Sequence, residues 1–205
     1  MRPRLFTPGP TQVPDEVINA MSRPMQHHRS PGFRTLFQGV TAYLQRLFKT
    51  KDDVITLTSS GTGAMESAVI NLMSRGDKVI TIEGGKFGQR WGEISRAYGL
   101  EVVTIDVPWG EAYPAEGLRQ ILKAHPDAKA VLLAHSETST GVAFDVQALA
   151  MVVREQSNAI TIVDGITSVG VLPFYKDDWN IDVVVSGSQK GSLLPPGLGF
   201  ISLND

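Results

Sequence analysis

Short apolar runs recur along most of this 205-residue chain, starting just after Lys51. The runs are only a few residues long and rich in β-branched side chains, which is typical of buried strands. Polar or turn-forming residues separate each run from the next. The candidate strands are residues 54–58, 78–82, 102–107, 130–134, 159–163, 182–185 and 199–203.

Segments of helical length lie between most of these candidate strands, and residues 64–73 are one example. A helix that connects two strands returns the chain to the same end of the sheet, so the two strands run parallel. The link from 187 to 198 contains Pro195-Pro196-Gly197 and is too short for such a helix. We therefore predict an α/β fold whose seven-stranded sheet is mainly parallel, has helices on both faces and ends in an antiparallel strand.

Residues 1–50 have a different pattern. A short helix is predicted for residues 14–21, with Pro14 in the first turn, where its missing N–H is tolerated. Residues 33–48 carry apolar side chains at helical spacing, which predicts an amphipathic helix. We expect residues 1–50 to form an amino-terminal segment and residues 51–205 to form one large domain.

Composition narrows the class of protein. The chain is 42% hydrophobic and 20% charged with a formal charge of −2, which is typical of a soluble globular protein. It has no Lys/Arg block of the kind that binds nucleic acid or an anionic membrane, so neither partner is expected. The absence of cysteine excludes disulfides, zinc–thiolate sites and a cysteine nucleophile, and no metal site is predicted. Because no apolar run resembles a signal peptide or a membrane span, we expect a cytoplasmic protein.

Two candidate strands end beside residues that could form one chemical site. Asp164 follows the run 159–163, and Lys190 lies in a loop of small residues after the run 182–185. Ligands bind at the carboxyl ends of parallel strands, so we expect the amine and the carboxylate to meet there. The pair suits pyridoxal phosphate, whose aldehyde forms a Schiff base with a lysine and whose ring nitrogen needs an anion to stay protonated. Taken separately, an aspartate such as Asp164 is more often a helix cap or turn residue, and a lysine such as Lys190 is more often a solvated surface residue.

The turn after the first candidate strand, Ser59-Ser60-Gly61-Thr62-Gly63, could bind a phosphate. Small residues there leave backbone N–H groups exposed at the positive end of the following helix. An ordinary tight turn with a Ser or Thr N-cap is the alternative. A dinucleotide site is a poorer match, because Glu66 occupies the position of the third small residue.

Two further segments follow strand ends. Phe87 could stack on a flat heteroaromatic cofactor, or it could form a helical core pair with Trp91 four residues later. Thr138 belongs to the hydroxyl-rich segment 136–140, which could bind a ring oxygen. The alternative for that segment is a loop leading into a helix capped by Asp145.

Together these segments resemble the class V aminotransferases of pyridoxal-phosphate fold type I, in particular the alanine–glyoxylate and the serine–pyruvate or serine–glyoxylate aminotransferases. The opening Thr7-Pro8-Gly9-Pro10-Thr11 resembles theirs as well. The resemblance covers essentially the whole chain, and its specific part is the lysine motif with the upstream aspartate. The motifs are Ser60-Gly61-Thr62-Gly63-Ala64-Met65-Glu66, Lys86-Phe87-Gly88-Gln89-Arg90, Glu137-Thr138-Ser139-Thr140-Gly141-Val142, Val163-Asp164-Gly165 and Ser186-Gly187-Ser188-Gln189-Lys190.

The resemblance implies a role for each candidate residue. Lys190 would bind the cofactor aldehyde and then shuttle the proton at the substrate Cα, and Asp164 would pair with the ring nitrogen. Phe87, where relatives often have tryptophan, would stack on one ring face. The other implied contacts are Ser60, Gly61, Thr62 and Gln189 with the phosphate, Ile166 with the second ring face and Thr138 with the ring hydroxyl.

The resemblance also implies an activity and an assembly. The activity would be amino transfer from serine or alanine to glyoxylate or pyruvate, in a homodimer whose active site includes part of residues 1–50. Family members are nearly twice as long and have a small carboxy-terminal domain whose arginine binds the substrate carboxylate. We therefore expect this chain to lack that domain and to be a truncated or split subunit. The alternatives are a cysteine desulfurase-like lyase, a phosphonate transaminase or a non-catalytic scaffold subunit, and a nucleotide-binding dehydrogenase is not favoured.

Overall fold

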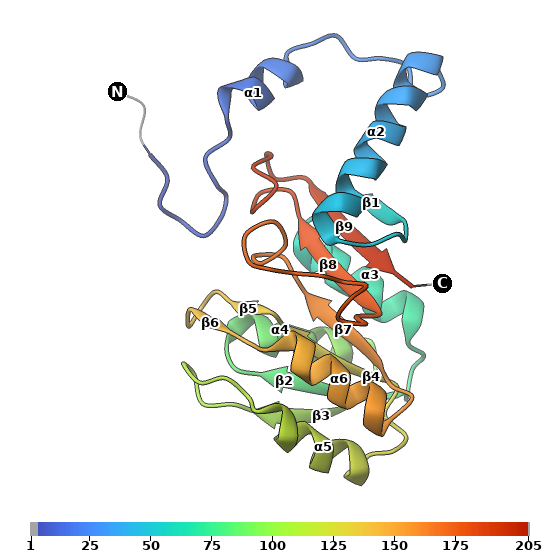
Figure 1. The fold of residues 1–205 in the computed structure, drawn as a ribbon, viewed down its shortest axis with the longest axis vertical. Helices are drawn as coiled ribbons and strands as arrows, with labels where there is room; N and C mark the ends of the chain where they lie inside the picture. The colour runs from blue at the N-terminus through green and yellow to red at the C-terminus, as the bar shows by residue number, and fades with distance from the viewer. Residues whose placement is uncertain (1–3, 205) are drawn as a thin grey trace.

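Six of the seven strands of the central sheet run in the same direction in the computed structural model, which describes residues 4–204 (Figure 1). The strand order is β1-β9-β8-β7-β4-β2-β3, and β9 is antiparallel to both of its neighbours. The mainly parallel sheet and the antiparallel last strand are thus confirmed. The strands are β1 (Val54–Thr58), β2 (Lys78–Glu83), β3 (Glu101–Asp106), β4 (Ala130–Ala134), β7 (Ile160–Asp164), β8 (Val183–Gly187) and β9 (Leu198–Leu203).

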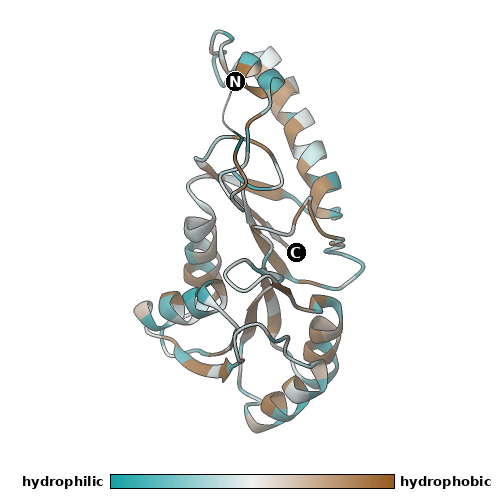
Figure 2. Cartoon of the chain, turned by 90° about the vertical axis from the view of Figure 1, so that its left-hand side faces the viewer, coloured by the Kyte–Doolittle hydropathy of each residue, from teal (hydrophilic) through white to brown (hydrophobic). Residues whose placement is uncertain are grey.

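Helices cover both faces of the sheet (Figure 2). One face is packed by α3 (Gly61–Leu72) and α4 (Lys86–Ala97), and the other by α5 (Ala115–Ala124) and α6 (Val146–Gln156). The carboxyl end of α2 (Pro31–Phe48) joins the second face through Leu44 and Phe48. None of the helices that the structure describes is long and apolar enough to span a bilayer.

Side chains alternate between the two faces along each strand. In β4, Ala130 and Leu132 pack with the α3/α4 layer, whereas Val131 and Leu133 pack with the α5/α6 layer. All four are fully buried. Burial on both faces explains why the central strand β4 appears in the sequence as a continuous apolar run.

The helices match the sequence pattern except near their ends. The amino-terminal helix α1 is Asp15–Met21. Helix α2 begins at Pro31, two residues before the predicted start, because the Ser30 side chain accepts a hydrogen bond from the Phe33 N–H at 3.2 Å. Asp145 caps α6 as expected, accepting from the Ala148 N–H at 3.0 Å.

The segment after β4 was interpreted either as a contact for a ring oxygen or as a loop leading into α6, and no strand was predicted in it. It contains a small antiparallel hairpin of β5 (Ser136–Glu137) and β6 (Val142–Ala143). Strands of two residues are too short to show an alternating pattern, so the sequence carried no signal for them.

A buried lysine outside the candidate site ties the two ends of the sheet domain together. Lys176 is fully buried, and its Nζ lies 2.7 Å from Asp52 Oδ2, just before β1. Nζ also donates to Asn204, which follows β9, and lies 3.9 Å from Asp177. The hydrogen bond from Lys176 lowers the pKa of Asp52, so the carboxylate form stabilises the fold above the ordinary pKa of an aspartate.

We expect Asp52→Ala to lower the free energy of unfolding by about 1 to 3 kcal/mol, because a buried ammonium loses its nearest anion but keeps Asn204 and Asp177 nearby. Urea denaturation measures the change. Asp53→Ala, an exposed neighbour, is the matched control and should change stability by less than about 0.5 kcal/mol. Equal losses in the two variants would contradict the assigned role of Lys176.

Candidate active site

The parallel pairing of β7 with β8 brings Asp164 and the lysine loop to the same edge of the sheet. Asp164 is the last residue of β7 and lies opposite Val185 of β8. β8 ends at Gly187, and Lys190 follows within the next turn. The two charged groups are close enough for each to affect the pKa of the other. The carboxyl end of the sheet therefore presents an acid and an amine together.

Asp164 is a carboxylate in an apolar environment. Its side chain is buried, and Oδ1 accepts a hydrogen bond from the Ile166 N–H at 2.8 Å. No donor among the described residues bonds to Oδ2. Burial raises the pKa of Asp164 to about 7; the Glu137 charge adds to the rise, and the Ile166 N–H, Arg90 and Lys190 oppose it. This acid lacks a cationic partner strong enough to offset its desolvation.

Lys190 is half-buried, and burial lowers the pKa of its amine while Asp164 opposes that effect. The amino-terminal segment packs against it. A Cβ built on Gly9 would lie within van der Waals contact of Lys190 Nζ, so Gly9 lies directly against the end of the lysine side chain. The Thr11 N–H donates to the Gln189 carbonyl at 3.0 Å, and the Thr11 hydroxyl donates to the Lys190 carbonyl at 3.1 Å. Residues far apart in the chain thus enclose one amine.

The amino terminus of α3 lies beside this loop. The Ser60 hydroxyl caps the helix by accepting from the Gly63 N–H, while the N–H groups of Gly61 and Thr62 have no acceptor among the described residues. Gly187 lies close to both Gly61 and Gln189. A Cβ built on Gly187 would be 3.5 Å from the Gly61 nitrogen and 3.0 Å from Gln189 Oε1. Gln189 Oε1 is buried and has no hydrogen-bond partner. Free donors and an unpaired amide therefore meet at a helix amino terminus.

Ile166 packs over this helix end. A Cβ built on Gly61 would collide with the Ile166 side chain, so the two residues are in close contact. Since the Ile166 N–H also donates to Asp164, one short segment contacts both the acid and the helix terminus.

Phe87 lies in the first turn of α4 and is half-buried. The Arg90 guanidinium carbon lies 4.9 Å from the centre of the Phe87 ring, and Arg90 Nη1 donates to the Thr62 hydroxyl at 3.2 Å. Trp91, by contrast, is fully buried and donates its indole N–H to the Leu133 carbonyl. Trp91 therefore belongs to the hydrophobic core, whereas Phe87 is only half-buried. Arg90 links Phe87 to the amino terminus of α3.

Thr138 lines the same cavity as Lys190. Its hydroxyl donates to Thr167 Oγ1 at 3.1 Å, and the Thr167 hydroxyl donates to the Ser136 carbonyl at 3.1 Å. Both threonines and Lys190 line a cavity of about 690 Å³, whose other wall includes Thr7 and Thr11. The cavity thus combines hydroxyl groups with a single amine.

Sequence reasoning did not assign roles to Glu137, Arg90, Thr167 or Gly9. Glu137 and Arg90 stood inside motifs that drew attention to their neighbours Thr138 and Phe87. Their contacts join elements far apart in the chain, and such contacts leave no local pattern. Only the excess of polar residues after strand ends could have indicated them.

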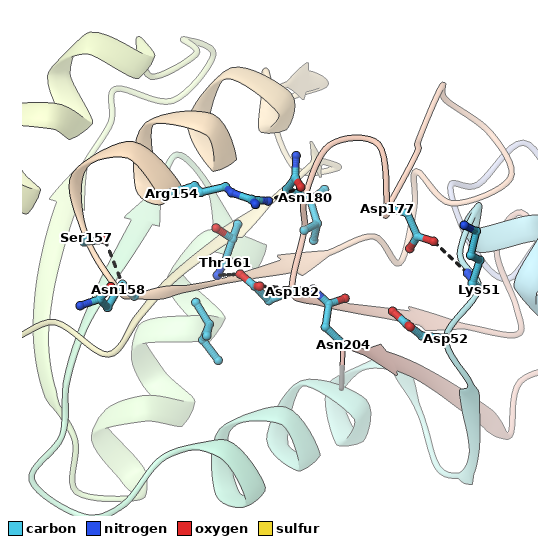
Figure 3. A pocket seen from close by; sticks show the side chains of 13 residues that line it. Lys51, Asp52, Arg154, Ser157, Asn158, Thr161, Asp177, Asn180, Asp182 and Asn204 are labelled. Atoms are coloured by element: carbon cyan, nitrogen blue, oxygen red, sulfur yellow. Dashed lines mark hydrogen bonds between the residues drawn. The ribbon is translucent and has the colours of Figure 1, made fainter.

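A second cavity, of about 510 Å³, lies at the opposite edge of the sheet, near the beginning of β7 (Figure 3). Its polar groups largely bond to one another: Asp182 accepts from the Thr161 N–H at 2.7 Å and from Asn204, and Arg154 donates to Asn180. Within residues 4–204, no cluster of three or more histidine or acidic side chains could hold a metal ion. The chemistry is therefore concentrated at the edge with Lys190.

We expect Asp164→Asn to stabilise the cofactor-free protein at about pH 8 by up to about 4 kcal/mol and to have little effect near pH 4. The folded state holds a proton on Asp164 that the unfolded state loses, so wild-type stability decreases as the pH rises from about 4 through about 7. Urea denaturation across this range measures the slope. Asp106→Asn, at the exposed end of β3, is the control, and equal slopes in the wild type and Asp164→Asn would contradict the assignment.

Known proteins resemble this chain over nearly its whole length. A relative from Synechococcus sp. named as the small subunit of a soluble hydrogenase is 43% identical over 202 residues, which are 98% of this chain and 53% of the relative. The serine–glyoxylate aminotransferase of Hyphomicrobium methylovorum is 42% identical over 207 residues, 98% of this chain and 51% of the relative. The crystal structure of alanine–glyoxylate aminotransferase from Nostoc sp. superposes with a TM-score of 0.94 at 32% identity, over 100% of this chain and 55% of that one.

This chain spans about half the length of the curated relatives that it matches. The sequence profile of the family described as Aminotransferase class-V matches residues 4–205. The fold, with its β7/β8 edge, is shared with the superposed aminotransferase structure. The chain therefore belongs to the class V aminotransferase family.

Proposed function

We propose that the full protein is a pyridoxal-phosphate-dependent aminotransferase that moves an amino group from serine or alanine to glyoxylate or pyruvate. The observation that carries this proposal is the pair formed by the half-buried amine of Lys190 and the buried carboxylate of Asp164 at one sheet edge. The names of the Hyphomicrobium and Nostoc proteins, serine–glyoxylate and alanine–glyoxylate aminotransferase, support the substrate class.

The site fits this cofactor in three respects. The free N–H groups of Gly61 and Thr62 suit a phosphate at a helix amino terminus. The side-chain amide of Gln189, whose Oε1 is buried and has no hydrogen-bond partner, lies next to them and has an N–H group that a phosphate oxygen could accept from. A protonated ring nitrogen beside Asp164 Oδ2 would replace the solvation that the carboxylate loses on burial. The residues proposed to hold the cofactor are Ser60, Gly61, Thr62, Phe87, Thr138, Asp164, Ile166, Gln189 and Lys190.

The chain's own residues divide the chemistry among them. When bound, pyridoxal phosphate supplies an aldehyde for the substrate amine and a ring that withdraws electrons from the substrate Cα. Lys190 anchors the cofactor and, once released, holds and returns the proton at that Cα. Asp164 keeps a proton on the ring nitrogen, and its low-dielectric environment strengthens that contact. Phe87 and Ile166 would hold the ring between two apolar surfaces, and Thr138 would contact the ring hydroxyl.

We also propose that the full protein is a homodimer in which residues 1–50 contribute to the interface and to the active site, while residues 51–205 bind the cofactor. Helix α2 projects from the sheet domain (Figure 1), and Leu36, Phe37, Val40 and Tyr43 on it are exposed. Four neighbouring apolar side chains on one projecting helix are typical of a surface that a second copy covers. Cytoplasmic location stays a prediction from the sequence pattern, and a small carboxy-terminal domain in the full protein stays a prediction of the resemblance.

We expect Phe37→Glu to convert the full protein from dimer to monomer, because a charge would be buried in an apolar interface. Light scattering coupled to gel filtration measures the mass. The control is Gln38→Glu, which adds the same charge at a neighbouring exposed position of α2 where the side chain is already polar. This variant should remain dimeric. If the Phe37→Glu variant is still a dimer, the interface does not include this face of α2.

We expect Lys190→Ala to abolish the visible absorbance band of the bound cofactor and to lower amino transfer about a hundredfold to ten-thousandfold, because the variant lacks both the anchoring amine and the proton carrier. The assay is glyoxylate- or pyruvate-dependent consumption of serine or alanine by the full protein. Lys190→Arg, which keeps the charge but not the nucleophile, should fail in the same way.

Borohydride labelling of the wild type should map to Lys190. A label on another lysine would contradict the site. A wild type that reacts with hydrogen and does not transfer amino groups would favour the activity for which the Synechococcus relative is named.

A further inference from the structure

We propose that Glu137 is a positioning residue for the proposed reaction: its buried carboxylate holds the first turn of α4 so that Phe87 stacks on the cofactor ring. This inference rests on the proposed function and adds to it a residue with no contact to the cofactor. Glu137 is the last residue of β5, and the β5–β6 hairpin lies beside α4 (Figure 1).

The Glu137 side chain is fully buried and accepts four hydrogen bonds. Oε2 accepts from the backbone N–H groups of Phe87 at 3.0 Å and Gly88 at 2.9 Å. Oε1 accepts from the Ser139 N–H at 3.2 Å and the Ser139 hydroxyl at 2.6 Å. All four partners act as donors, so both oxygens of the Glu137 side chain are engaged as acceptors.

The carboxylate replaces a local helix cap. The N-cap position of α4 is Gly85, which has no side chain to cap the helix. A Cβ built on Gly85 would lie 2.5 Å from Glu137 Cδ, so glycine at this position is what admits the carboxylate. Ser139 completes the cap, because its hydroxyl accepts from the Lys86 N–H at 3.0 Å. The free N–H groups of the helix amino terminus are thus satisfied by a segment about 50 residues away in the chain.

The cap of α4 comes from the same segment that carries Thr138, and this links the two parts of the site. Glu137 and Ser139 flank Thr138, which reaches the loop after Asp164 through its hydrogen bond to Thr167. The same short segment therefore sets the position of the stacking residue Phe87 and of the proposed ring-hydroxyl contact. A local serine or aspartate at position 85 would cap the helix equally well but would leave it independent of the rest of the site.

The electrostatic effects around Glu137 are consistent with a position beside the proposed cofactor site. The Glu137 charge lies close enough to Asp164 to raise its pKa, while Arg90, stacked on Phe87, acts in the opposite direction. The helix dipole of α4 favours an anion where Glu137 lies. Glu137 therefore belongs to the same charged group of residues as the proposed cofactor site.

The test is a double-mutant cycle on the full protein, with the dissociation constant of pyridoxal phosphate as the readout. Glu137→Gln should weaken binding roughly tenfold, because one charge-assisted acceptor faces an amide donor. In a Phe87→Leu background the same change should weaken binding by less than about twofold, because Glu137 acts through Phe87. Glu93→Gln, an exposed glutamate of α4, is the control and should bind as the wild type does.

Each outcome decides the question. Equal losses in both backgrounds would mean that Glu137 only stabilises the fold, and the positioning role would be wrong. If far-ultraviolet circular dichroism shows that Glu137→Gln does not fold, Ser139→Ala in the same cycle removes one hydroxyl from the cap and should again lose its effect in the Phe87→Leu background. A wild type that binds no pyridoxal phosphate at Lys190 refutes the proposed function itself, whereas additive effects in a wild type that does bind it refute only the role of Glu137.

Discussion

The parallel register of β7 and β8 is the constraint on which the candidate site depends. Asp164 is paired with Val185 in one neighbour and with Ala134 in the other, so β4 and β7 end at the same level and β8 ends two residues further along, at Gly187. The loops that follow them carry Thr138, Ile166 and Lys190. A shift of one residue would turn the Asp164 side chain toward the other face of the sheet, and the acid and the amine would no longer meet. The buried apolar residues on both faces hold the register in place.

Two buried acidic side chains at this edge, Glu137 and Asp164, differ in how many hydrogen bonds they accept. Glu137 accepts four hydrogen bonds and caps the amino terminus of α4. Asp164 accepts one, and burial raises its pKa to about 7. The difference lies in the number of donors that the fold aims at each oxygen. A cation therefore gains more electrostatic stabilisation beside Asp164, which has one donor, than beside Glu137, which has four. This difference favours Asp164 as the proposed partner of the ring nitrogen.

Much of the fold could be predicted from local patterns. All seven strands of the sheet lie where apolar runs predicted them. In β4 and β8, which are buried throughout, the reason is that strands covered on both faces need continuous apolar residues. The short link rich in Pro and Gly before β9 predicted its reversal; Ser188 closes this link by donating to the Pro195 carbonyl and accepting from the Leu198 N–H. The β5–β6 hairpin and the start of α2 at Pro31 were missed, since the first is too short for a pattern and the second depends on a side-chain cap.

The sequence by itself determined the α/β class, the antiparallel last strand and the presence of an acid and an amine after two strand ends, because these follow from periodicity, chain length between runs and residue type. Only the tertiary structure decided that Gly9 lies against Lys190, that Arg90 joins Phe87 to Thr62 and that Glu137 caps α4. Each of these contacts joins segments far apart in the chain, and the packing of α3 and α4 on the sheet sets their distances. Local sequence preferences have no means of encoding such distances, since they depend on how whole elements pack together.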